Sequence, residues 1–330
     1  MAGYLPAMIY LIILLLLIPI RNYLLHRVLG PAQKYDTEVK LRLIPDIISG
    51  WKTVVMLFSL ALIFGLAIWW LNKNPALQGL WNNFIIDKRV PASFCEQVHI
   101  NSPVRQPVNT FSNIVYLLTA FIILNSLWKS RHATTKGHLS ESNIFCVLFS
   151  IVLLYVFIAS TFYHSSLIGI AHTLDYSAVF SFSLFPVMFF LYQWWLIRKK
   201  ILTITERRKS ETRFLLLFAG ANLGLALLTP KGKEQIIAIL LVLSFLISAI
   251  ITVIIEKHKP GTNYLIYTII AVIAAVILFE FDKYKIICNP KSFFQPHSLW
   301  NIFIGISAFW FYLYMRSETK PGALIVKLKQ

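Results

Sequence analysis

Residues 144–163 read IFCVLFSIVLLYVFIASTFY, twenty consecutive residues without a charged side chain. About 20 apolar residues in a helix span the hydrocarbon core of a bilayer, so this stretch predicts a transmembrane helix. The stretch is too long for a strand and lacks the apolar–polar alternation of a membrane β-barrel. Eight further stretches are of the same kind, at residues 5–20, 54–71, 111–128, 170–192, 214–228, 236–256, 264–281 and 299–314.

The composition supports a membrane protein. Of the 330 residues, 57% are hydrophobic and 14% are charged, whereas soluble proteins average about 25% charged residues. We therefore expect an all-α integral membrane protein with two spans before the polar segment 72–108 and seven after it. This predicts an N-terminal extension at residues 1–92, a seven-helix domain at residues 93–316 and a tail at residues 317–330. The first stretch lacks the features of a signal peptide, and we expect it to be a retained span.

The net charge of +17 is explained by membrane topology. If nine spans alternate, 22 of the 31 Lys and Arg residues fall on one side and 9 on the other. The positive-inside rule makes the first side cytoplasmic, with the N-terminus outside and the C-terminus inside. The run from Arg198 to Lys209 could also bind nucleic acid or anionic lipid. Because the basic residues are spread over five short segments, we interpret them as topology determinants and expect no nucleic-acid partner.

Polar side chains of the spans gather near the non-cytoplasmic helix ends. Because such side chains are costly in a membrane, they indicate a functional site by default. Ser160 and His164 are four residues apart, as are His297 and Asn301, so each pair shares a helix face. Two histidines from different helices with Asp175 nearby could hold a zinc ion, which at catalytic sites usually has three protein ligands and a water. The full set is Asn109, Ser112, Asn113, Ser160, His164, His172, Asp175, Glu280, Asp282, His297 and Asn301.

Four segments together resemble the alkaline ceramidases and their bacterial relatives, which belong to the CREST superfamily of seven-helix membrane hydrolases. The segments agree with that family in order, spacing and helix placement over residues 93–316, and the two early spans lie outside the resemblance. They are residues 94–96 (FCE), 106–113 (QPVNTFSN), 160–164 (STFYH) with 174–175 (LD), and 288–290 (CNP) with Gln295 and residues 297–301 (HSLWN).

The resemblance implies a zinc-dependent amidase, in a bacterial inner membrane, that cleaves a ceramide-like lipid into a fatty acid and a sphingoid base. His164 and His297 would bind the zinc. Asp175 would take a proton from the water that the zinc activates. Ser160 would orient the site or stabilise the oxyanion. Supporting positions would be Glu96, Asn109, Ser112 and Asn113.

Asn301 departs from the family pattern, which has a second histidine there in His-x-x-x-His. An amide oxygen is a poor zinc ligand beside imidazole. The third ligand could then be Asn301 or His172, or the site could bind metal weakly or bind another metal. The chain could also be an inactive lipid-binding or receptor-like relative. A third hypothesis is a transporter. It is disfavoured because the polar residues cluster at one face and no inverted repeat is visible.

The residues at the expected calcium site are the second departure from the family pattern. Eukaryotic alkaline ceramidases surround a calcium ion with acidic residues before the first helix of the domain. Glu96 matches this pattern, but Ser93 and Gln106 stand where carboxylates are expected, and calcium needs several oxygen ligands. We therefore expect a calcium site to be absent or weak. A lipid amide and the membrane are the expected partners, and nothing in the sequence points to a protein partner.

Cys95 and Cys288 both precede helices of the seven-helix domain on the non-cytoplasmic side, where disulfides form. We expect a Cys95–Cys288 disulfide that joins the starts of the first and last of those helices. Cys146 lies within a span and is expected to be a free packing residue. Gly220 and Gly224 form a G-x-x-x-G pattern that could pack helices within the domain or between chains, and we expect the former.

Overall fold

The computed structural model describes residues 51–87, 94–130, 144–198, 204–230, 232–255 and 261–317. These residues form helices joined by turns and loops, with one isolated β-bridge between Ile86 and Ile168. The helices are α3 (Trp51–Lys73), α5 (Pro107–Ser112), α6 (Ile114–Ser130), α8 (Ile144–Ser166), α9 (Gly169–Arg198), α10 (Ile204–Leu228), α11 (Glu234–Ile255), α12 (Thr262–Lys283) and α13 (Pro296–Ser317), with a short 3-10 turn at Pro75–Leu77.

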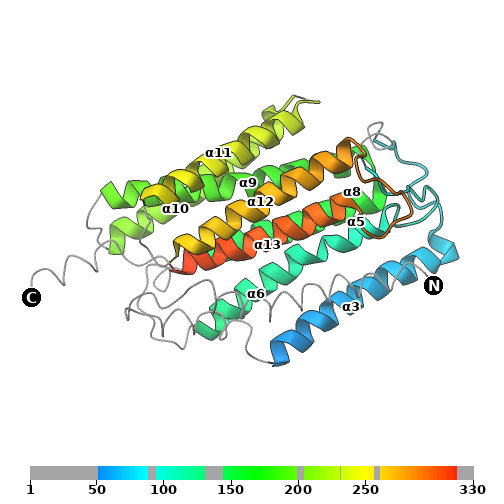
Figure 1. The fold of residues 1–330 in the computed structure, drawn as a ribbon, viewed down its shortest axis with the longest axis horizontal. Helices are drawn as coiled ribbons and strands as arrows, with labels where there is room; N and C mark the ends of the chain where they lie inside the picture. Colours follow the sequence, from blue (N-terminus) through cyan, green and yellow to red (C-terminus); the bar gives the residue numbers. More distant parts are fainter. Residues whose placement is uncertain are drawn as a thin grey trace, which may run out of the picture.

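Eight helical segments of the described ranges are long and apolar enough to cross a membrane, with α5 and α6 together forming one of them. This confirms the expected all-α, multi-pass membrane protein. The ninth expected span, residues 5–20, lies outside the described residues, as does the tail from residue 318 onward. Figure 1 shows the long helices running side by side, with α3 on one flank and α11 on the other.

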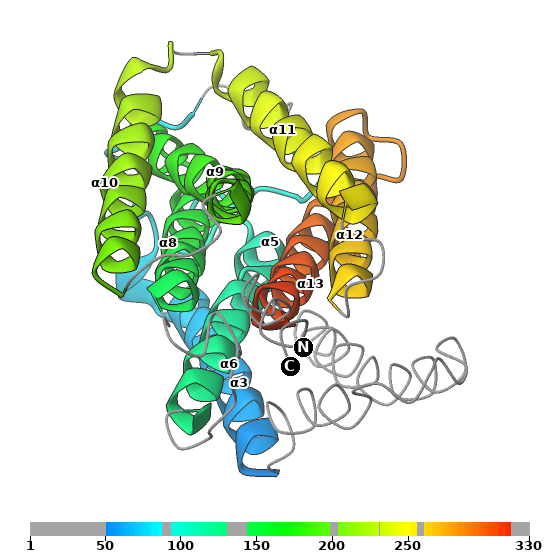
Figure 2. The same cartoon turned by 90° about the vertical axis from the view of Figure 1, so that its left-hand side faces the viewer.

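The bundle is held together by an aromatic core. Phe149 of α8 stacks on Phe185 of α9 at a centroid distance of 4.9 Å and meets Phe311 of α13 edge-on at 5.6 Å. All three rings are buried. Viewed along the helices, α8, α9, α11, α12 and α13 surround the centre of the bundle, and α10 lies outside α9 (Figure 2).

Close helix packing occurs at Gly305 of α13 and not at the G-x-x-x-G pattern. A Cβ atom built on Gly305 would lie 2.3 Å from Cγ2 of Val115 on α6, so only glycine fits there. At Gly220 and Gly224 no atom lies within 4 Å of such a Cβ atom. The expectation that these two glycines pack helices within the domain is therefore wrong, because α10 turns its Phe218 face, and not its glycines, toward α9.

The expected disulfide joins the loop before α5 to the loop between α12 and α13. Cys95 and Cys288 are bonded, with their Cα atoms 5.5 Å apart. Cys146 is buried and free, as expected. The end of the bundle that carries this disulfide is called the site end below.

Candidate functional site

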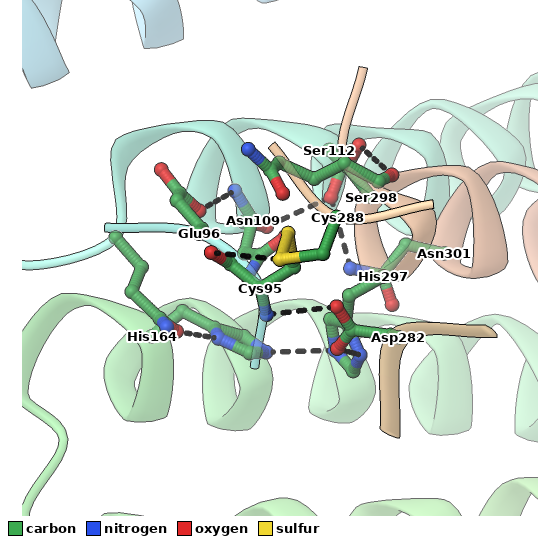
Figure 3. Close-up of polar contacts among 12 residues, drawn as sticks. Cys95, Glu96, Asn109, Ser112, His164, Asp282, Cys288, His297, Ser298 and Asn301 are labelled. Atoms are coloured by element: carbon green, nitrogen blue, oxygen red, sulfur yellow. Dashed lines mark hydrogen bonds and ion pairs between the residues drawn. A yellow bond between two sulfur atoms is a disulfide. The ribbon is translucent and has the colours of Figure 1, made fainter. Parts of the chain in front are cut away.

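The site end brings together two histidines that are 133 residues apart in the chain. His164 lies in the last turns of α8 and His297 in the first turn of α13. Nε2 of His164 lies 3.2 Å from Nε2 of His297 (Figure 3). The ring of Phe94 meets both imidazoles edge-on, with centroid distances of 5.0 and 4.8 Å. Both histidines are buried, so this pair is shielded from bulk water.

The other nitrogen of each imidazole faces an oxygen atom. Nδ1 of His164 lies 2.8 Å from Oε1 of Gln106, and Nδ1 of His297 lies 3.7 Å from Oδ2 of Asp282. The Gln106 amide oxygen only accepts hydrogen bonds, so the proton of a neutral His164 ring belongs on Nδ1 and its Nε2 presents a lone pair to His297. Nδ1 of His297 makes no hydrogen bond, so its ring can carry the proton on Nε2 and donate it to His164, or leave Nε2 free for a cation. Metal-binding histidines are commonly oriented in this way by an oxygen behind the ring.

The spacing of the two Nε2 atoms fits a shared cation. Facing lone pairs repel each other unless a metal ion or a proton lies between them. Two nitrogens bound at ~2.05 Å to one tetrahedral zinc lie about 3.3 Å apart, close to the 3.2 Å observed. Nearby, both amide atoms of Asn109 and of Asn113 are buried without a hydrogen-bond partner. Unpaired buried polar groups are rare, and they are typical of sites that bind water or ions.

Both candidates for a third ligand are engaged elsewhere. Oδ1 of Asn301 accepts a hydrogen bond from the Tyr116 hydroxyl at 3.2 Å, and its Nδ2 donates to Oγ of Ser112 at 2.9 Å. Nε2 of His172 lies 3.6 Å from Oδ2 of Asp87. Among the residues whose placement is described, no three His, Cys, Asp or Glu side chains group as a metal site. The described residues thus offer two imidazoles to a metal, one protein ligand fewer than the three usual at catalytic zinc sites.

Ser160 and Asp175 meet between α8 and α9. Their side chains lie close enough to interact, and both line the cavity described below. A serine hydroxyl has one proton to donate, and a carboxylate accepts it. Of the two expected roles for Ser160, this contact favours orienting Asp175 over stabilising an oxyanion.

The four supporting residues lie at α5, and Ser112 joins it to α13 through Asn301. The carboxylate of Glu96 accepts hydrogen bonds from the backbone N–H groups of Val108 and Asn109 at 2.7 and 2.9 Å, which caps the start of α5. Burial raises the pKa of Glu96 to about 8, although these two hydrogen bonds lower it. Ser112 donates to the Asn109 carbonyl at 2.8 Å. Asn113 ends α5 with its buried amide.

Two residues without a specific predicted role lie against the histidines. Gln106 opens one of the four segments of the resemblance and stands where a carboxylate is expected, and its side chain contacts His164. Asp282 stood among the polar residues at the same depth, and it links the disulfide loop to His297. Its Oδ1 accepts a hydrogen bond from the backbone N–H of Cys95 at 2.9 Å. The position of Gln106 directly before Pro107 at a helix start was the available sequence signal.

An elongated cavity of about 620 Å³ begins at these polar groups. His297 and Phe311 both line it and are fourteen residues apart on α13, a distance of ~21 Å along a helix. Polar residues including Asp175 and Asn301 line its site end, and the remainder is mostly apolar, with Ser183, Thr268 and Ser307 as polar exceptions. The partly exposed Lys283 also lines it, so the cavity reaches the surface at that end. This shape suits a lipid chain with a polar group beside the histidines.

No model of a known protein family matches the chain, and comparison with curated proteins gives no match.

Proposed function

We propose that the protein is a zinc-dependent membrane amidase that hydrolyses a ceramide-like lipid, as its resemblance to the alkaline ceramidases implies. The observation that carries the proposal is the pair of imidazole nitrogens 3.2 Å apart at the polar end of a long apolar cavity. Lipid amides have the matching shape, because their polar amide group joins long hydrocarbon chains.

The described side chains provide the remaining functions of an amidase. Zinc, when bound by His164 and His297, would supply Lewis acidity to the amide carbonyl and make water more acidic. Asp175 accepts a proton from the attacking water, and Ser160 holds its carboxylate in place. The apolar walls of the cavity bind a hydrocarbon chain and exclude water from the reacting amide.

The site would face the non-cytoplasmic side of the membrane. The excess of Lys and Arg in loops at the opposite end supports this orientation. The N-terminus would then lie outside and the C-terminus in the cytoplasm, as in a bacterial inner membrane protein with an external site.

A second candidate function is lipid binding without catalysis. Asn301 favours it, because both ends of its amide are hydrogen-bonded to Tyr116 and Ser112. A protein of this kind would hold the lipid in the cavity and release it unchanged.

Metal analysis combined with lipid turnover distinguishes the two functions. We expect about one zinc ion per chain in protein purified in detergent, and its loss in His164→Ala and His297→Ala. His99→Ala is the matched control, because His99 is exposed in the loop before α5. Wild-type protein should release fatty acid from a fluorescent ceramide, and both site variants should not. Metal-free protein that binds the ceramide without cleaving it would refute the amidase and support the binding function.

A further inference from the structure

His172 and Asp87 form a buried pair beside the two histidines of the site. Nε2 of His172 lies 3.6 Å from Oδ2 of Asp87, and both side chains are at most 7% exposed. The Tyr163 hydroxyl donates to the same carboxylate oxygen at 3.4 Å. A buried carboxylate beside an imidazole fixes the orientation of the ring and stabilises its protonated form.

The backbone holds Asp87 in place at the turn between α8 and α9. The Asp87 N–H donates to the Leu167 carbonyl at 2.9 Å, and Ile86 is bridged to Ile168. Leu167 has a φ of 55°, which leucine rarely adopts, and its side chain is fully buried. Strained conformations of this kind persist only where the surroundings enforce them. Asp87 thus reaches the site from the segment before the seven-helix domain.

His172 faces the same cavity as the proposed catalytic carboxylate. It precedes Asp175 by three residues on α9, so the two share a helix face, and both line the cavity with His297. The ring of Tyr163 lies between His172 and His164, with centroid distances of 5.1 and 5.3 Å. Since His172 and His297 both line the cavity, a substrate there can contact both.

We propose that His172 donates the proton to the leaving amine, with Asp87 as its positioning residue, a role that rests on the proposed amidase function. When the C–N bond of the tetrahedral intermediate breaks, its electron pair moves to the nitrogen, which takes a proton from the His172 imidazolium. The amine leaves neutral, and the acid keeps the oxygen of the attacking water. The proton accepted by Asp175 passes to solvent at the cavity mouth, and His172 regains one from there.

Two substrates with the same acyl chain test this role in purified full-length protein. One is the amide of a long-chain amino alcohol, and the other is a 4-nitrophenyl ester, whose leaving group needs no proton. We expect His172→Gln to lower kcat for the amide by about 10²- to 10⁴-fold, with KM unchanged and a far smaller loss for the ester. Asp87→Asn and Tyr163→Phe should also lower kcat for the amide more than for the ester, but by smaller factors. Asp87→Glu should have a higher kcat for the amide than Asp87→Asn. His99→Gln is the control.

Zinc content, measured on the same samples, distinguishes a proton donor from a metal ligand. We expect His172→Gln to retain the zinc of the wild-type protein. Three results for His172→Gln would overturn the proposal while leaving the amidase function intact. They are equal losses of kcat for amide and ester, no loss of kcat for either, and a loss of zinc. A wild-type protein that cleaves neither substrate would overturn the amidase function itself, and this role with it.

Discussion

Replacing Gly305 with alanine should force α6 and α13 apart and destabilise the bundle. The new Cβ atom would lie 2.3 and 2.6 Å from the two methyl carbons of Val115 and 3.0 Å from its Cβ. Val115 is 3% exposed, and a β-branched side chain in a helix has little freedom to rotate away. Overpacking of a well-packed core costs about 1–3 kcal/mol, and two overlaps with one further tight contact place Gly305→Ala near 3 kcal/mol.

The unfolding of purified protein in mixed detergent micelles, followed by SDS titration, measures this change in free energy. Gly220→Ala is the matched control, because it makes the same substitution in a helix where no atom lies within 4 Å of the new Cβ. That control should be neutral or stabilising, since alanine is favoured over glycine in helices by up to about 1 kcal/mol. The double variant Gly305→Ala/Val115→Ala removes the overlapping methyl groups and should recover part of the loss.

Gly305→Ala should also affect the site. Asn301 lies one turn before Gly305 and contacts Tyr116, which follows Val115 on α6. Separation of the two helices should therefore lengthen that contact and reduce lipid turnover. A Gly305→Ala protein as stable as Gly220→Ala, or a double variant no more stable than Gly305→Ala, would refute the close packing of α6 and α13.

Three further outcomes follow from the site end. The Cys95→Ala/Cys288→Ala variant should lose at most about 5 kcal/mol of stability, the loop-closure entropy for a separation of 193 residues. Cys146→Ala is the control and should keep this contribution in the same SDS titration. Equal stability of the two variants would contradict the role of the disulfide. Asn301→His should bind zinc more tightly than the wild type in chelator competition, because imidazole replaces an amide, and unchanged affinity would place residue 301 away from the metal. The raised pKa of Glu96 means that the folded protein favours the protonated carboxyl group. The resulting contribution to stability is present below about pH 4.5 and is lost as the pH rises through about 8. Glu96→Gln should flatten this part of the curve of stability against pH, and an unchanged curve would contradict the raised pKa.

The helices and the grouping of the site residues could be predicted from sequence because a bilayer imposes strict limits. Only a helix satisfies its backbone hydrogen bonds within one segment, so an uncharged stretch such as residues 144–163 has one available structure. Spans of alternating direction then bring His164 and His297 to the same depth. The Cys95–Cys288 disulfide follows from the same logic, since both cysteines precede helices on one side.

Lateral packing could not be predicted in the same way. The G-x-x-x-G pattern at Gly220 faces outward, whereas Gly305, which has no partner glycine four residues away, is the point of close contact. A hydrophobicity pattern does not distinguish a helix face that meets lipid from one that meets another helix, because both are apolar. Which helices pack together depends on the shapes of the side chains on both of them, as where Val115 of α6 packs on Gly305 of α13.

The sequence by itself determined an all-α membrane protein and the set of polar residues that share one end of it, because span length and charge distribution are properties of the chain alone. Only the tertiary structure decided which of those residues touch. It placed the two Nε2 atoms 3.2 Å apart, engaged Asn301 with Tyr116 and Ser112, and brought Asp87 from a loop to His172. Such contacts depend on rotation and spacing between helices to within about an ångström, and these follow from side-chain packing across elements that are far apart in sequence.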